Sequence, residues 1–343
     1  APTKTVFLDN TARQWTAGES GLHGLAFHPH WSANRYLFTF GGETNAGVGT
    51  HHNRLVRWQT DPANPYRVLP ESRTVLIELI RTNPVHQGGD LHFGPDGYLY
   101  VPIGDEVVFT AASSSSQHID RGLSGGILRI DVDGRPGSLT PNRGAGVVGS
   151  YRVPPDNPWV GATRFQGAIV DPSRVRTEFW AVGFRNPHRM SFIPGTSEML
   201  VGDVGNARWE EINRVGRGGN FGWVFMEANE ATTFLGGGAS IPTNFIAPLW
   251  SYPHVSAAPA GADASFVGNC VIGGFVYEGS NYPQITGKYL AGDFVAGHIW
   301  AIGWSPRLQI ERIAGLSPGP TAFGLDPATG EILIATAAGV FKL

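Results

Sequence analysis

One pattern recurs four times along this chain: a short apolar segment, a turn that contains proline, and a second apolar segment. The four copies are Leu25–Pro29 with Tyr36–Phe40, Leu91–Pro95 with Tyr98–Val101, Met190–Pro194 with Met199–Val201, and Phe323–Pro327 with Ile332–Ile334. Each copy has the composition of a β-hairpin, in which two short strands are joined by a turn. A hairpin that recurs over most of the chain predicts a repeat architecture built from strands.

The turn-forming residues support the same prediction. The sequence holds 47 glycines and 25 prolines among 343 residues, spread along the chain rather than clustered. Such a distribution is typical of turns between many short strands, and no long segment free of Gly and Pro has helical spacing. We therefore expect an all-β fold: a six-bladed β-propeller of four-stranded antiparallel blades, with residues 1–343 forming one domain. A β-helix or a large β-sandwich is the structural alternative.

Bulk composition excludes several classes of function. The formal net charge is −3, so the basic surface that binds nucleic acid is not expected. No apolar run approaches the roughly 18 residues of a membrane span. Cys270 is the single cysteine, which rules out an internal disulfide and a cysteine zinc site. The chain begins Ala1-Pro2, which fits either a mature end left by signal-peptide cleavage or an end trimmed from a longer chain; of these we favour the first and expect a periplasmic or extracellular protein.

A histidine stands at an unusual place in the second copy of the repeat. His86 is followed by Gln87 and two glycines, and the strand after this motif ends in Gly104-Asp105. Glycines remove side chains where another group must approach the backbone. From these residues alone, His86 is either a loop histidine held by its neighbours or a residue that faces a ligand.

An ordered set of motifs gives the chain a resemblance to a known family. The motifs are Gly21–Pro29, His86–Tyr100, Gly126–Asp131, Val153–Trp159, Gly183–Pro187, Gly202–Asn213 and Gly218–Trp223. Together they resemble the soluble sugar dehydrogenases that use pyrroloquinoline quinone (PQQ), the glucose/sorbosone and aldose dehydrogenase group. The resemblance covers nearly the whole chain and implies a six-bladed propeller. It also implies oxidation of the anomeric hydroxyl of an aldose to the lactone, with a sugar substrate and an external electron acceptor as partners.

The resemblance implies a role for each matching residue. His86 would be the general base that takes the proton of the sugar hydroxyl, and Asp105 would orient it. Arg185 would bind the quinone oxygens and stabilise charge that grows there during hydride transfer. Asn186, Glu19 and His86 itself would help to bind the cofactor.

A calcium ion is implied as a second cofactor. The loop after Asp203 resembles the family's calcium site, where backbone carbonyls help to hold the ion, and Gly205 and Asn206 are the matching positions. Calcium prefers oxygen ligands and would act as a Lewis acid toward PQQ.

The sequence departs from the family where the three carboxylates of PQQ would be bound. Glucose-oxidising members have a lysine near the segment that here reads Phe294–Gly297, and many members have an Arg-x-Arg pair where this chain reads Leu316–Phe323; neither segment holds a cation. A second function therefore stays open: a non-catalytic propeller of the same fold that binds carbohydrate or protein.

Structural roles are the alternatives for the same residues. Asp105 could cap a turn, because Gly-Asp pairs recur at 202–203 and 292–293. Arg185 could pair with a carboxylate such as Asp203. Glu210 and Glu211 could brace the calcium loop or form surface ion pairs. The histidine pairs at 28 and 30 and at 51 and 52 leave a transition-metal site as a minor alternative.

Overall fold

The computed structural model describes residues 5–45, 49–107, 115–144, 146–233 and 241–343. The chain divides into two compact units: Ala1–Val108 with His118–Trp180, and Phe109–Gln117 with Ala181–Leu343. They are called unit 1 and unit 2 below, and each is described by itself. That residues 1–343 form one domain stays a prediction.

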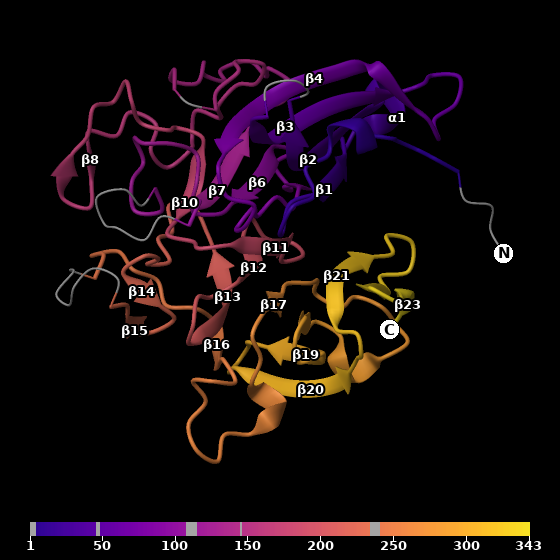
Figure 1. Cartoon of the computed structure of the whole chain (residues 1–343), viewed down its shortest axis with the longest axis vertical. Helices are drawn as coiled ribbons and strands as arrows, with labels where there is room; N and C mark the ends of the chain where they lie inside the picture. The colour runs from indigo at the N-terminus through magenta and orange to yellow at the C-terminus, as the bar shows by residue number, and fades with distance from the viewer. Residues whose placement is uncertain (1–4, 46–48, 108–114, 145, 234–240) are drawn as a thin grey trace. The chain divides into compact units, whose positions relative to one another are not determined.

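Unit 1 is built around two antiparallel sheets. The first contains, in spatial order, β1 (Leu22–Phe27), β2 (Tyr36–Thr44), β3 (His51–Thr60) and β4 (Val68–Arg81) (Figure 1). The second has the order β10-β7-β6-β5, formed by β5 (His92–Phe93), β6 (Leu99–Ile103), β7 (Gly126–Ile130) and β10 (Phe179–Val182), the last at the boundary between the units. A separate hairpin pairs β8 (Arg164–Phe165) with β9 (Ala168–Ile169).

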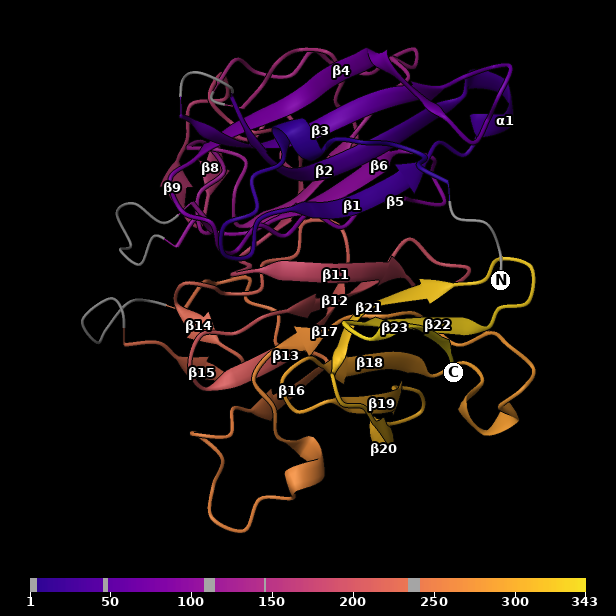
Figure 2. The same cartoon turned by 45° about the vertical axis from the view of Figure 1, so that its right-hand side comes forward.

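Unit 2 contains three larger sheets. The first has the order β11 (Pro187–Phe192), β12 (Met199–Asp203), β13 (Trp209–Val215) and β16 (Trp250–Pro253). The second consists of β17 (Val271–Ile272), β18 (Tyr289–Asp293), β19 (His298–Gly303) and β20 (Gln309–Gly315), and Figure 2 shows β18, β19 and β20 side by side. The third has three strands: β21 (Pro320–Leu325), β22 (Ile332–Thr336) and β23 (Gly339–Lys342). A hairpin pairs β14 (Met226–Glu227) with β15 (Glu230–Ala231).

All four hairpins predicted from the repeat are confirmed. They are the antiparallel pairs β1–β2, β5–β6, β11–β12 and β21–β22. Helices are short in the described residues: α1 (Trp31–Asn34) and the 3-10 turns η1 (Thr11–Arg13), η2 (Ala264–Phe266) and η3 (Pro283–Ile285). None of these helices is long and apolar enough to cross a membrane. The fold is all-β, as the sequence predicts.

The number of sheets differs from the expected six. The described residues form four four-stranded sheets and one three-stranded sheet, each with the consecutive antiparallel strands of a propeller blade. Six blades are expected from the chain length at about 45–60 residues per blade. Residues 131–178 are an insertion between two adjacent strands, β7 and β10, and contribute bridges and a small hairpin rather than a larger sheet. An insertion of that kind inflates a count based on length.

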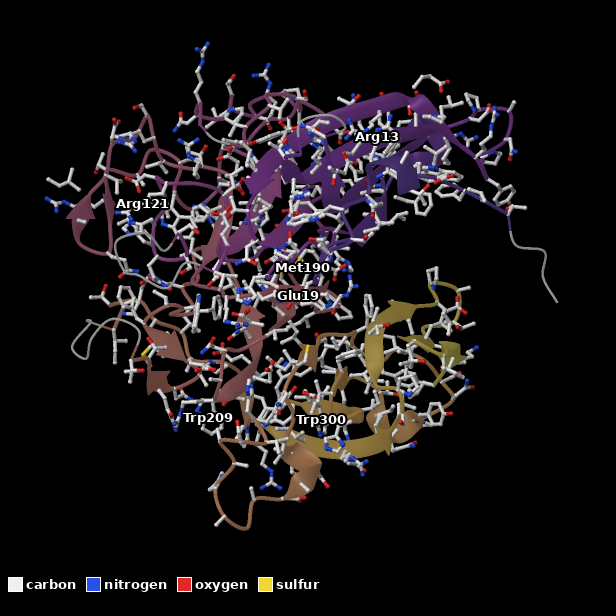
Figure 3. All side chains as sticks on the ribbon, viewed as in Figure 1. Arg13, Glu19, Arg121, Met190, Trp209 and Trp300 are labelled. Carbon is white, nitrogen blue, oxygen red and sulfur yellow. The ribbon has the colours of Figure 1, made fainter. Side chains whose placement is uncertain are left out.

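Aromatic and branched side chains form the buried clusters of both units. In unit 2, one cluster joins the β11–β16 sheet to the β17–β20 sheet through Ile212, Tyr252, Tyr289 and Trp300, all at most 1% exposed; Figure 3 labels Trp300 on β19. In unit 1, Leu37, Val56, Trp58 and Val68 form a cluster across β2, β3 and β4. These rigid sheets carry the loops in which the candidate site residues lie.

Candidate functional site

The predicted base and its predicted partner are in contact in unit 1. His86 Nδ1 lies 2.7 Å from Oδ1 of Asp105, and the two residues are 5% and 0% exposed. A carboxylate accepts only, so Nδ1 carries the proton in the neutral ring and Nε2 keeps its lone pair. An imidazole held in this way can accept a proton through Nε2.

The backbone around this pair is unusual. His86 has φ 54°, and Glu106 and Val107, which follow Asp105, have φ 66° and 60°. Side chains other than glycine rarely adopt these values, and such residues cluster at functional sites. Oε2 of Glu19 accepts the backbone N–H of His86 at 2.8 Å; Figure 3 labels Glu19. Unit 1 therefore brings together three of the predicted site residues: Glu19, His86 and Asp105.

The two glycines after Gln87 seat this loop against its neighbours. A Cβ on Gly88 would lie 2.7 Å from the carbonyl oxygen of Pro102 on β6, and a Cβ on Gly24 of β1 would lie 2.2 Å from the carbonyl oxygen of Gly89. Gly88 and Gly89 also have φ 64° and 97°. The glycines thus let the His86 loop pass between β1 and β6, where a side chain would not fit.

Arg185 and Asn186 are gathered by one buried carboxylate in unit 2. Oδ2 of Asp203 accepts the backbone N–H of Arg185 at 3.0 Å, and Oδ1 accepts that of Asn186 at 2.7 Å. Asp203 is 4% exposed. The alternative in which Arg185 pairs with Asp203 is met in part: the aspartate accepts the Arg185 backbone N–H rather than the guanidinium, and the charge of Arg185 still lowers the pKa of Asp203.

One N–H donor of the Arg185 guanidinium has no hydrogen-bond acceptor in the structure. Its NH1 donates to the carbonyl of Val204 at 2.9 Å, and its NH2 lies 3.4 Å from Oδ1 of Asn206. Nε is buried and has no acceptor. The guanidinium lies over the Trp223 ring, with Cζ 5.7 Å from the ring centroid. A buried N–H without a partner is costly, so an acceptor on a ligand would be favoured here.

The loop after β12 is wrapped around a second carboxylate. Oε1 of Glu227 accepts the backbone N–H groups of residues 206, 207, 208 and 209 at 2.8, 2.8, 3.0 and 3.2 Å. Since N–H and C=O point in opposite directions across a trans peptide, the carbonyls of residues 205–208 point away from Glu227. Gly205 is required here, because its Cβ would lie 1.6 Å from the Trp209 carbonyl oxygen. Outward carbonyls at Gly205 and Asn206 are ligands of the type that calcium prefers.

Glu210 and Glu211 are buried rather than on the surface. Oε2 of Glu210 accepts the N–H of Gly205 at 3.2 Å, and Oε1 lies 2.6 Å from Nε2 of His254, so Glu210 braces the loop as the structural alternative expected. Burial raises the pKa of Glu211 to about 7. Burial, together with the charge of Glu211, raises the pKa of Asp203 well above its usual range; the two residues are opposite each other on β13 and β12.

The aspartate of each repeated Gly-Asp pair binds backbone N–H groups, and Asp105 also contacts the His86 ring. Asp105, Asp203 and Asp293 all lie at or just beyond the end of a second blade strand, and each accepts backbone N–H groups from nearby loops. Asp105 accepts the N–H of Val107 at 2.8 Å, so the capping alternative is present. The ring nitrogen of His86 is its additional contact.

Sequence reasoning did not assign Glu227 to the site. No motif marks it, since its role depends on the fold of a loop about twenty residues away along the chain. In the described part of the chain, no group of three or more His, Cys, Asp or Glu side chains is arranged to hold a metal. His28 Nε2 instead lies 3.0 Å from Oδ1 of Asp133, and His51 stacks on Trp15.

Both segments without cations lie in unit 2: Phe294–Gly297 joins β18 to β19, and Leu316–Phe323 leads from the end of β20 into β21. Phe294 and Val295 lie between β18 and β19 and are 46% and 61% exposed. The N–H groups of Val295 and Ala296 donate to Oδ1 of Asp293 at 2.8 and 2.6 Å. Arg312 on β20 donates through Nε to Nδ1 of His298 at 2.8 Å. The backbone of this turn is thus held by hydrogen bonds to Asp293, and its side chains are apolar.

Comparison with known proteins identifies the family. The model of the family described as "Glucose / Sorbosone dehydrogenase" matches residues 3–314. The chain belongs to this family. The glucose/sorbosone dehydrogenase resemblance inferred from the motifs is thereby confirmed.

The curated relatives of this chain include a quinoprotein dehydrogenase and proteins that are not named as enzymes. HIPL1 protein of Arabidopsis thaliana is 28% identical over 333 residues, covering 86% of this chain and 46% of the relative. Quinoprotein glucose dehydrogenase B of Acinetobacter calcoaceticus is 26% identical over 237 residues, covering 64% and 43%. The chain spans about half the length of the curated relatives it matches.

Solved structures of sugar dehydrogenases share the fold. The PQQ-bound form of an aldose sugar dehydrogenase from Streptomyces coelicolor has a TM-score of 0.61 and 20% identity, covering 94% of this chain and 76% of that one. The apo form of the soluble aldose sugar dehydrogenase from Escherichia coli has a TM-score of 0.67 and 18% identity, covering 96% and 83%.

Proposed function

We propose that this chain is a PQQ-dependent dehydrogenase that oxidises the anomeric hydroxyl of an aldose to the lactone. The observation that carries the proposal is the buried His86–Asp105 pair, 2.7 Å apart, in a chain of the glucose/sorbosone dehydrogenase family. Hydrogen-bonded to Asp105 through Nδ1, His86 presents an unprotonated Nε2 to a substrate hydroxyl. The positive φ of 54° at His86 is a second observation in support, because such backbone conformations cluster at functional sites.

In this proposal each residue has a defined task. His86 takes the hydroxyl proton on Nε2, Asp105 holds the ring and stabilises the imidazolium, and Glu19 fixes the His86 backbone. Bound PQQ would supply the hydride acceptor, polarised by a calcium ion at the carbonyls of Gly205 and Asn206. Arg185 would donate hydrogen bonds to the quinone oxygens through its unpartnered Nε, and Asn186 would help to hold the cofactor.

This cofactor needs a base and hydrogen-bond donors at its reacting end and cations at its carboxylates, and the residues of each unit can be compared with these needs separately. His86 and Arg185 offer a base and a buried donor, whereas the turn at Phe294 and Val295 offers no cation. Charge-assisted hydrogen bonds contribute about 1.5–3 kcal/mol each. PQQ should therefore bind more weakly here than in family members that have the lysine and the Arg-x-Arg pair. The sugar, the electron acceptor and the periplasmic or extracellular location stay predictions.

A non-catalytic function is the second candidate, favoured by the missing cations and by the relatives. HIPL1 protein and the Hedgehog-interacting protein of Mus musculus match this chain, the latter at 30% identity over 172 residues, 47% of this chain and 23% of the relative. On this alternative the same fold would bind carbohydrate or protein without redox chemistry.

Reconstitution separates the two functions. Purified protein titrated with PQQ in the presence of calcium is expected to change the PQQ absorption spectrum, and the loaded protein should reduce an artificial dye when an aldose is added. Isothermal titration with the same sugars, without PQQ, serves as the parallel measurement. Sugar binding with no spectral change and no dye reduction would favour the non-catalytic function.

A variant that adds a cation tests whether the missing lysine near Phe294–Gly297 limits PQQ binding. Val295→Lys adds a cation at a 61% exposed position, where the backbone is already fixed by Asp293. It is expected to tighten PQQ binding by about 10-fold, the effect of one charge-assisted contact of roughly 1.5 kcal/mol. Val340→Lys, at a 68% exposed valine on β23, is the matched control and should leave affinity unchanged. Equal affinities in both variants and the wild type would show that this turn does not contact PQQ.

A further inference from the structure

Unit 1 contains a polar cavity whose lining includes none of the residues proposed for PQQ, calcium or proton transfer. Its volume is about 220 Å³, below the roughly 300–1,000 Å³ that is typical of pockets for drug-sized ligands. The cavity lies between η1, the end of β2, β3 and β4, and its charged lining residues are Arg13, Arg54, Arg73 and Glu78. A cavity of this size and polarity suits one small charged group.

Hydrogen bonds to neighbouring side chains hold two of these arginines in place. Arg54 is 7% exposed. It donates through Nε to Oε2 of Glu78 at 2.7 Å and through NH1 to Oε2 of Glu43 at 3.0 Å. Its NH2 donates to Oδ1 of Asn45 at 2.6 Å, and Arg73 donates through NH2 to the same oxygen of Glu43. The two guanidinium groups are therefore oriented before a ligand arrives, which lowers the entropy cost of binding one.

The carboxylates of this cluster do not balance its positive charge. Glu43 is 3% exposed and accepts from both Arg54 and Arg73, so one negative charge serves two guanidinium groups. Three arginines and two glutamates, Glu43 and Glu78, leave one positive charge in excess at the cavity. An excess of positive charge attracts anions and repels metal cations.

Hydrogen-bond donors also remain at this cavity. Among the described residues, Glu43 is the one hydrogen-bond acceptor of the Arg73 side chain, and Nε of Arg73 is buried without a partner. The Arg13 side chain, labelled in Figure 3, is exposed, and the same part of the chain offers it no hydrogen-bond or ion-pair partner. Guanidinium donors are the groups that bind carboxylates and phosphates with paired hydrogen bonds.

We propose that Arg13, Arg54 and Arg73 form a binding site on unit 1 for an oxyanion group, a carboxylate or a phosphate, carried by a small ligand. Arg54 and Arg73 supply oriented positive charge from β3 and β4, and Arg13 supplies unpaired donors from η1. The site does not depend on the proposed sugar oxidation. The structural alternative is that the cluster only ties β3 and β4 to Glu43, and anions would then leave the arginines unaffected.

Anion titration of the cofactor-free full chain tests the site. Nitrogen NMR of the arginine Nε–H groups, assigned with Arg13→Gln and Arg73→Gln, observes these side chains directly. Inorganic phosphate and acetate are the probes, and sodium chloride at equal ionic strength is the reference. Saturable shifts of the Arg13 and Arg73 signals are expected, and the anion with the lower Kd shows which group the site prefers. If both anions give only the shifts that sodium chloride gives, the proposal is wrong.

Affinities of variants show whether the anion binds at this cavity. Arg13→Gln is expected to weaken binding of the preferred anion by about 10-fold, the loss of one charge-assisted hydrogen bond. Arg13 is exposed, so this variant should fold like the wild type. Arg164→Gln is the matched control, because Arg164 is also exposed in unit 1 and donates to the carbonyl of Gly167 at 3.1 Å; it should bind like the wild type. Wild-type affinity in Arg13→Gln, or equal losses in the two variants, would overturn the proposed site.

Discussion

His86→Ala is expected to lower kcat of the reconstituted enzyme by about 10²- to 10⁴-fold, the usual contribution of a general base. The reason is geometric: Asp105 holds Nδ1 at 2.7 Å, so Nε2 is the atom that can accept the sugar proton. Binding of PQQ should weaken far less than turnover, because the variant removes one of several proposed contacts to the cofactor and no cation. Stopped-flow reduction of bound PQQ by an aldose measures the effect on the chemical step.

The matched control for this experiment is His30→Ala. His30 is exposed, and its side chain does not cap helix α1, of which it is the N-cap residue. This variant should retain wild-type turnover. If His86→Ala turns over at the wild-type rate while still binding PQQ, the base is another residue and the assignment of His86 is wrong.

Glu211→Gln is expected to remove a pH-dependent contribution of about 3 kcal/mol to the free energy of unfolding. Burial raises the pKa of Glu211 from 4.5 to about 7, so the folded state keeps this proton over a pH range in which the unfolded state has lost it. The stability contributed by Glu211 is therefore fully present below about pH 4.5 and is lost as the pH rises through about 7. Glutamine resembles the protonated acid and has no such dependence.

Urea unfolding in the presence of a chelator, at pH 5 and at pH 8, measures this difference. The wild type should lose about 2.5 kcal/mol more than Glu211→Gln between these two pH values, because part of the full effect, at about 1.36 kcal/mol per pKa unit, is already lost at pH 5. Glu230→Gln, a partly exposed acid paired with Arg208, is the control and should follow the wild type. Parallel pH curves for the wild type and Glu211→Gln would mean that Glu211 is not protonated in the folded protein near neutral pH.

The sequence alone determined the local units of this protein. The four hairpins were readable because a strand–turn–strand unit is specified by neighbouring residues: apolar alternation, proline in the turn and glycine where φ is positive. The family was readable for the same reason, since motifs such as His86–Tyr100 are contiguous. The pairing of His86 with Asp105 was expected only through the family resemblance, and composition by itself would have left Asp105 as a turn residue.

Tertiary structure decided what depends on residues that are distant in sequence. The count of sheets required knowing that residues 131–178 are inserted within one sheet. The role of Glu227 depends on a loop folded against it, and no nearby motif marks this residue. The sequence does not show whether a charged side chain is buried. Glu211 could have formed a surface ion pair, and its pKa is raised only because the folded chain buries it. Local pattern thus fixes the strands and turns, while charge, burial and hydrogen-bond partners are properties of the folded chain.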